Sequence, residues 1–160
     1  DVTLVGTCHS NRVKYLQALR GLGVHIWGWG SWQTSQVASM YHGKSLTQSQ
    51  LLKVYAQSKI IVNVDRNPAS PIPTNLRCFE AAQVGGFILT DYKPTLKQVF
   101  KIGQEIDCFT TPAYLRRKVE FYLNHPQSRR RLAQNMFARV KKDHTYTTRL
   151  KKLFRELSVP

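Results

Sequence analysis

Residues 2–30, VTLVGTCHSNRVKYLQALRGLGVHIWGWG, decide the fold. Val2–Val5 is a short β-branched run, and Val24–Trp27 is a second apolar run of the same length. Between them, residues 12–22 carry apolar side chains at helical spacing, and Gly23 follows as a helix terminator. A strand, a helix and a second strand in this order predict a βαβ unit with parallel strands.

The same alternation continues along the chain. Thr47 followed by Gln50 is a capping-box pattern, which predicts a helix over residues 47–58. Residues 59–64, KIIVNV, form a nearly continuous apolar run, as expected for a parallel strand covered on both faces. Residues 65–73 contain three prolines and are predicted to form a loop.

Further elements complete the pattern. Thr74 is the expected cap of a helix over residues 75–84, and residues 87–90 are the next buried strand. Three apolar stripes at helical spacing follow: Leu115/Val119/Tyr122, Leu132/Met136/Val140 and Tyr146/Leu150/Leu153/Leu157. The sequence therefore predicts one α/β domain over residues 1–160, with a Rossmann-like, doubly wound parallel sheet of about five or six strands and a helical C-terminal layer.

The charge of the chain indicates an anionic partner. The chain has 24 Lys and Arg against 9 Asp and Glu, and residues 111–160 alone carry 13 basic and 3 acidic side chains. Nucleic acid, a membrane surface and a phosphorylated ligand all fit such an excess. No nucleic-acid-binding motif accompanies it, so nucleic acid is the weakest of the three readings.

The three cysteines, Cys8, Cys78 and Cys108, are widely spaced and form no C-x-x-C pair. Neither a disulfide framework nor a zinc site is indicated, and a reducing, cytoplasmic setting fits best. No apolar run approaches the ~20 residues that cross a bilayer, and the first residues lack a signal-peptide pattern. We expect the chain to be a piece of a longer protein.

Five segments in order carry a resemblance to a known family: VTLVGTCHSNRVKYLQAL, SKIIVNVDRN, NLRCFEAAQVGGFILTDY, FKIGQEIDCF and HTYTTRL. Together they resemble the C-terminal domain of the CgeB-like, spore-maturation-type glycosyltransferases of the GT-B group. The resemblance implies a hexosyltransferase-like activity, a nucleotide-sugar donor at the C-terminal edge of the sheet, and an acceptor delivered by a separate N-terminal domain. Such a half-protein is expected to be inactive alone. A catalytically inactive nucleotide-binding module is the alternative.

Two loops are candidates for the donor's phosphates. Gly6 and Thr7 open the first strand-to-helix loop, and Arg12 follows in the first turn of the predicted helix. Free N–H groups and the helix dipole favour an anion there. A tight turn at Gly6 and a solvated Arg12 are the alternative.

The second candidate loop holds Asn75, Leu76, Arg77 and Glu80. The resemblance implies that Glu80 binds the ribose hydroxyls; favouring the helix dipole is its alternative role. A planar arginine fork suits the diphosphate, as we expect for Arg77. The chain has no D-x-D pair, and GT-B enzymes neutralise the leaving group with fixed cations. We therefore predict metal independence and no cofactor.

One position departs from the family pattern. Many retaining GT-B enzymes have a glutamate eight positions before the ribose-binding one, in contact with the transferred sugar, and here Ile72 stands there. The sugar must then be held differently, and the stereochemical outcome stays open.

The remaining candidates lie in other loops of the same edge. The second strand is followed by Trp29, Gly30 and Trp32. We expect these residues to line the pocket of the nucleotide base. The alternative is that the tryptophans belong to the core or to an interdomain contact. Arg66 follows the IIVNVD strand and is a phosphate or sugar candidate. His9, in the first loop, is the one weak candidate for a catalytic group.

The tail has its own prediction. Residues 146–157 form an amphipathic helix whose apolar stripe is broader than a surface helix needs. We expect it to dock on the N-terminal domain of the same full-length chain. A peripheral contact with an anionic membrane is the competing account.

Overall fold

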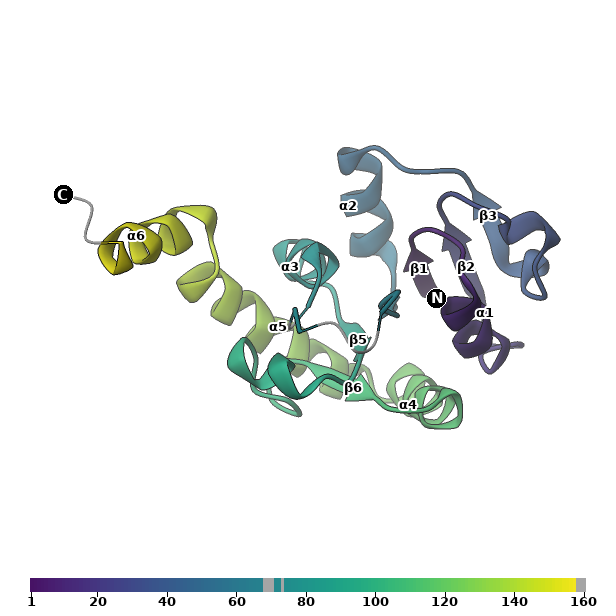
Figure 1. Cartoon of the computed structure of the whole chain (residues 1–160). Coiled ribbons are helices and arrows are strands. Elements are labelled where there is room, and N and C mark those ends of the chain that lie inside the picture. Colours follow the sequence, from purple (N-terminus) through teal and green to yellow (C-terminus); the bar gives the residue numbers. More distant parts are fainter. Residues whose placement is uncertain (68–70, 73, 158–160) are drawn as a thin grey trace.

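The protein, analysed as a computed structural model, is described over residues 1–67, 71–72 and 74–157. Its centre is a six-stranded sheet in the order β3-β2-β1-β4-β5-β6, and every neighbouring pair of these strands is parallel (Figure 1). The strands are β1 (Val2–Val5), β2 (Val24–Trp27), β3 (Tyr41–Gly43), β4 (Ile60–Asn63), β5 (Ile88–Asp91) and β6 (Asp107–Phe109).

Helices cover both faces of the sheet. They are α1 (Ser10–Gln17), α2 (Gln48–Gln57), α3 (Leu76–Gln83), α4 (Pro112–Asn124), α5 (Pro126–Asp143) and α6 (Tyr146–Glu156), with short 3-10 turns η1 (Trp32–Thr34), η2 (Ala38–Met40) and η3 (Pro94–Gln98). One buried cluster joins α1 and α4 to the sheet, and a second joins α2 and α3 to it, while α5 contributes to both. This two-sided core confirms the predicted doubly wound α/β fold.

Several predicted boundaries shift. The first helix ends at Gln17 rather than Leu22, because the chain turns through residues 18–22 and reaches a positive φ at Gly21 and again at Gly23. The Thr47–Gln50 capping box forms as predicted. The short strands β3 and β6 were not predicted.

The predicted cap of α3 was wrong. Asn75, not Thr74, occupies the N-cap, and its side chain accepts a hydrogen bond from the backbone N–H of Arg77. The Thr74 hydroxyl instead donates to the sulfur of Cys78 at 2.8 Å. The predicted loop 65–73 falls partly outside the described residues.

The order of the strands reverses between β1 and β4, because the chain runs from β1 towards β3 and then returns to β4. The carboxyl ends of these two strands carry the first loop and the loop before α3. In doubly wound sheets ligands bind at this switch point. The structure thus brings the two predicted phosphate loops to one edge of the sheet.

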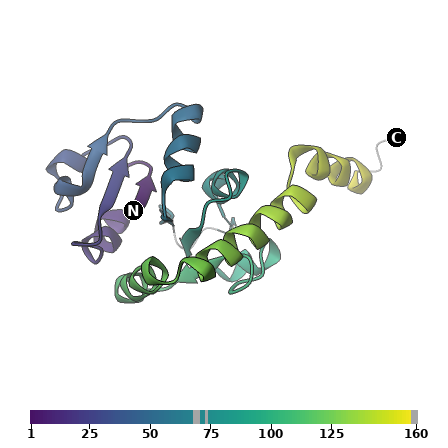
Figure 2. The same ribbon diagram turned by 180° about the vertical axis from the view of Figure 1, so that it is seen from behind.

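The last helix stands apart from the sheet. Figures 1 and 2 show α6 extending from the end of α5, and no residue of α6 is buried. The apolar side chains of its stripe, Tyr146, Leu150, Leu153, Phe154 and Leu157, are all exposed. None of the helices in the described part of the chain is long and apolar enough to cross a membrane.

Candidate functional site

Two arginine side chains meet over the glycine at the end of β1. A side-chain carbon placed on Gly6 would lie 2.2 Å from Nη1 of Arg12 and 3.1 Å from Nη2 of Arg77. The absence of a side chain at Gly6 therefore makes room for both guanidinium groups. The charge of Arg77 lowers the pKa of Arg12, and an anion bound between the two guanidinium groups would relieve this repulsion.

Arg12 is built into the fold. It is 5% exposed, its Nε donates to the carbonyl of Val64 at 2.8 Å, and its Nη1 donates to the carbonyl of Thr7 at 2.8 Å. Burial and the charge of Arg77 lower the pKa of Arg12 to about 10, so it stays protonated at neutral pH. The solvated alternative for Arg12 is excluded. Arg12 ties the end of β4 to the first loop.

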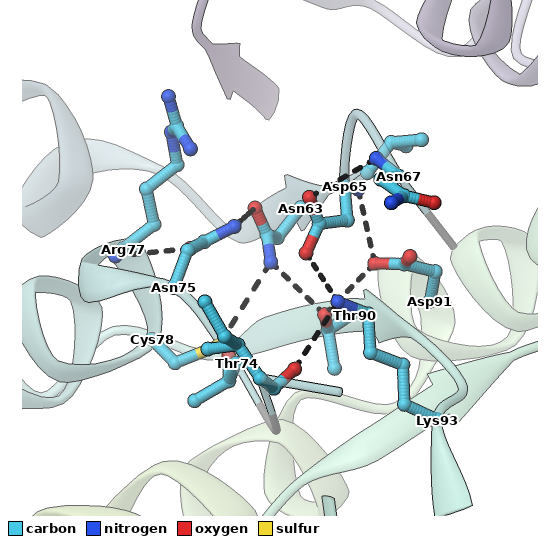
Figure 3. Close-up of polar contacts among 12 residues, drawn as sticks. Asn63, Asp65, Asn67, Thr74, Asn75, Arg77, Cys78, Thr90, Asp91 and Lys93 are labelled. Carbon is cyan, nitrogen blue, oxygen red and sulfur yellow. Dashed lines mark hydrogen bonds and ion pairs between the residues drawn. The ribbon is translucent and has the colours of Figure 1, made fainter. Parts of the chain in front are cut away.

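Hydrogen bonds hold Arg77 at its side chain and at its backbone, and Figure 3 draws those that run from its backbone through Asn75 and Asn63 to Thr90. The Nε of Arg77 donates to the carbonyl of Val5 at 2.7 Å. Its backbone N–H is held by Asn75, whose amide donates to Oδ1 of Asn63 at 3.0 Å. The amide of Asn63 donates in turn to the hydroxyl of Thr90 at 3.0 Å. Side chains from β4 and β5 thus fix the first turn of α3.

Neither arginine has a carboxylate partner among the described residues. Arginine offers five N–H donors, and Arg77 uses only its Nε within the described structure. Its Nη groups are left to face the space beside Gly6. The pair can therefore receive a multiply charged anion in a fixed geometry.

A second polar group lies beside this network. Lys93 is buried, forms an ion pair with Asp65, and donates to the backbone carbonyl of Ile72 at 3.3 Å (Figure 3). Asp91 accepts from the backbone N–H of Asp65 at 3.1 Å. These contacts anchor the beginning and a later part of the loop between β4 and α3. Through its backbone, Ile72 is part of this anchor.

Sequence reasoning missed Asn63, Thr90, Asp91 and Lys93. A signal was present for Asn63, Thr90 and Asp91, because a polar side chain in a buried strand needs a partner, whereas Lys93 lies beyond β5 and carries no such signal. Nothing in the sequence indicates which partner each one has.

His9 caps the first helix. Its Nδ1 accepts from the backbone N–H of Arg12 at 3.4 Å, and its Nε2 is buried without a partner in the described structure. Burial, with help from the charges of Arg12 and Arg66, lowers the pKa of His9 to about 4. A neutral ring that accepts at Nδ1 carries its proton on Nε2. His9 is therefore better suited to donate a hydrogen bond than to act as a base at neutral pH.

The two tryptophans of the loop after β2 have different surroundings. Trp32 is fully buried, and its indole N–H donates to the carbonyl of Gly6 at 3.0 Å, so the core alternative holds for it. Gly30 has φ +95°, and a side-chain carbon there would lie 3.0 Å from Cβ of Cys8. Trp29 is 63% exposed and remains free to contact a ligand or another domain.

Glu80 and Leu76 lie one helical turn apart and face a different space from Arg77. With Phe79 of the same helix they line a cleft of about 500 Å³, whose other walls come mainly from α5 and α6 and include Phe137, His144 and Tyr146. Thr7 and Arg66 are exposed at the edge of the sheet. Of the predicted residues, Arg12 and Arg77 thus form a pair at the switch point, and Leu76 and Glu80 line a separate cleft.

Within the described residues, no three His, Cys, Asp or Glu side chains gather closely enough to hold a metal ion. Cys8, Cys78 and Cys108 are free thiols. Burial raises the pKa of Cys78 to about 12, which makes it an inert core residue.

A parallel sheet of this order, with helices on both faces, defines the Rossmann-like α/β class. The sequence model described as glycosyl transferase-like matches residues 11–155. The chain belongs to this glycosyl transferase-like family. No curated protein sequence matched the chain.

Solved structures share the fold. HepE from Anabaena, determined with UDP-glucose, has a TM-score of 0.75 at 14% identity, over 99% of this chain and 49% of HepE. Sucrose-phosphate synthase from Thermosynechococcus elongatus has a TM-score of 0.74 at 15% identity, over 98% of this chain and 45% of that one. This chain thus spans about half the length of either protein.

A third structure is that of a single domain. The C-terminal domain of the group 1 glycosyl transferase LpcC from Francisella tularensis has a TM-score of 0.68 at 9% identity, over 91% of this chain and 86% of that domain. The architecture is therefore that of one half of a GT-B glycosyltransferase, as predicted.

Proposed function

We propose that this chain is the donor-binding half of a glycosyltransferase and holds the diphosphate of a nucleotide-sugar between Arg12 and Arg77. The observation that carries the proposal is the pair of guanidinium groups over Gly6, held by backbone carbonyls and lacking a carboxylate partner among the described residues. HepE, which shares the fold, was determined with UDP-glucose.

The chemistry of glycosyl transfer explains why such a pair is useful. When the bond between the sugar and the diphosphate of the donor breaks, the nucleoside diphosphate leaves with an additional negative charge. Cations that are already in place stabilise that charge without reorganising. Two fixed arginines supply the positive charge that a metal ion would otherwise provide. We therefore propose that the reaction is metal-independent.

Other residues fit the remaining parts of the donor. Glu80 offers two acceptor oxygens to the ribose diol, and the cleft beside it has room for the nucleoside. The buried Nε2–H of His9 would gain a partner from a phosphate or sugar oxygen. Trp29 is available to the base, although a contact with the other domain is equally open to it.

The transferred sugar needs a separate explanation because Ile72 offers no carboxylate. We propose that the described parts of the loop before α3, which Lys93 anchors at Asp65 and at Ile72, take part in positioning it. The acceptor and the rest of the active site would come from an N-terminal domain, so this chain alone should bind donor without turning it over. The CgeB-like subfamily remains a prediction from the five sequence segments.

Calorimetric titration with UDP, UMP and a DNA oligonucleotide tests the proposal. We expect UDP to bind more tightly than UMP, because only the diphosphate spans both arginines, and to bind equally well with EDTA present. UDP affinity should change little between 50 and 200 mM salt, whereas DNA binding to the basic tail should fall steeply. Equal affinity for UMP and UDP, or a need for a divalent ion, would contradict the proposal. A chain that binds only DNA would be the nucleic-acid module instead.

A further inference from the structure

The second feature of interest lies on the sheet face beside α2, among residues that play no part in donor binding. His25 of β2 and His42 of β3 stand next to each other at the edge of the sheet. They line a small hollow of about 220 Å³ together with Thr3, Trp27 and Ser58. His25 is half-buried and His42 is exposed, so solutes can reach the pair.

The two imidazole rings are hydrogen-bonded to each other through their Nδ1 atoms, and a metal ion held by both would replace the proton of that bond. The Nδ1 atoms are 3.3 Å apart, and the rings meet edge to face at 84°. Trp27 packs against His42 with ring centroids 5.0 Å apart, which limits the rotation of that imidazole. The two nitrogens thus lie close together on two hydrogen-bonded strands, in side chains that line the same hollow.

This spacing fits a shared metal ion. Imidazole nitrogen binds zinc at roughly 2.0–2.1 Å. Two nitrogens 3.3 Å apart and equally distant from one ion would subtend an angle of about 105–110°, which is close to the tetrahedral value. The two ligands come from adjacent strands of the sheet, so little ordering is needed to bring them together.

We propose that His25 and His42 form a binding site for a late first-row divalent transition metal ion, with Zn²⁺, Ni²⁺ and Cu²⁺ as its class of ligand. Imidazole suits these ions, whereas Mg²⁺ and Ca²⁺ prefer oxygen ligands. The protein supplies two ligands and water completes the coordination. The site is therefore more open than a structural four-ligand zinc site.

Binding would join β3 to the rest of the sheet. β3 is a three-residue edge strand, and its register with β2 shifts between Ile26 and Trp27. A metal ion held by one histidine from each strand would cross-link this irregular pair. An ion that binds only the folded chain also raises its stability by mass action.

The test is titration of the chain with Zn²⁺ and Cu²⁺ in a buffer that does not chelate metals, with Mg²⁺ as the comparison ion. We expect one ion per chain, reversal by EDTA, tighter binding of Cu²⁺ than of Zn²⁺, and no binding of Mg²⁺. His42→Ala and His25→Ala should each weaken binding by more than about tenfold, the loss seen even for residues that only orient a ligand.

His125→Ala is the matched control, because His125 is an exposed histidine at the start of α5, stacked on Phe121. It should leave the affinity unchanged. Should His25→Ala fail to fold, His42→Ala decides alone, since His42 is exposed. The proposal is overturned if the His42 variant binds Zn²⁺ as the parent chain does, if His125→Ala loses as much affinity, or if Mg²⁺ binds equally well. Because Glu80, Arg12 and Arg77 are absent from this hollow, the result is independent of donor binding.

Discussion

The molecule has two concentrations of positive charge that behave differently. The tail, residues 111–160, carries 13 Lys and Arg, several of them exposed or paired with a carboxylate one helical turn away, as in Arg139–Asp143 and Lys152–Glu156. At the switch point, backbone carbonyls hold both Arg12 and Arg77 in place. Exposed pairs contribute little energy. The difference teaches that fixed geometry, rather than the amount of charge, indicates where a diphosphate should bind.

The largest effect should follow from removing the buried arginine. Arg12→Ala leaves the carbonyls of Val64 and Thr7 without their charged donor, so we expect the free energy of unfolding to fall by about 3 kcal/mol. Denaturant unfolding followed by circular dichroism measures it. Arg12→Lys keeps the charge but cannot form the fork, and should be intermediate. A stability equal to that of the parent chain would mean that the first loop does not depend on this contact.

Arg77→Ala should act on binding rather than on folding. Its Nη groups have no partner in the described structure, so we expect UDP affinity to fall about ten- to hundredfold, the loss of a charged hydrogen bond or two. Arg131→Ala, an exposed arginine of α5, is the matched control and should change affinity less than about twofold. Equal losses of UDP affinity in both variants would show that the arginines attract UDP only through the overall positive charge of the chain.

Glu80→Ala separates the ribose role from the helix-dipole role. If the carboxylate binds the ribose hydroxyls, UDP affinity should fall by about 1–3 kcal/mol while the melting temperature stays the same. Calorimetry and thermal melting on the same samples give both values. An unchanged affinity with a lower melting temperature would establish the helix-dipole role instead.

The smallest effect concerns pH. His9 has a pKa of about 4 in the folded chain, below the ordinary value near ~6.5, so the unfolded chain binds more protons between these values. The contribution of His9 to stability is therefore complete above pH 6.5 and declines as the pH falls towards 4. His9→Asn keeps an N-cap acceptor and removes the titration. Urea unfolding at pH 7 and pH 4.5 should show a smaller loss for this variant; an identical loss would place the effect in other histidines.

Local patterns predicted much of the fold because they depend on neighbouring residues. The capping box at Thr47 and the apolar run before Asp65 both specify elements through short-range spacing. The strand β6 was missed because three residues, including Asp107, give no periodicity to detect.

The site was harder to predict because its contacts are long-range. Arg12 is buried through the carbonyl of Val64, 52 positions away, and Arg77 is oriented through that of Val5, 72 positions away. Likewise, Trp32 and Trp29 are similar in sequence context, yet one lies in the core and the other is exposed. The sequence supplied candidates, and the packing of the sheet edge separates structural residues from those left available to a ligand.

A crystal structure of this chain with UDP tests the central claim most directly. We predict that diphosphate oxygens lie within hydrogen-bonding distance, about 2.7–3.2 Å, of guanidinium nitrogens of both Arg12 and Arg77, above Gly6, with no metal ion between them. A bound nucleotide whose phosphates contact neither arginine, or phosphates held by a metal ion instead, would contradict the account.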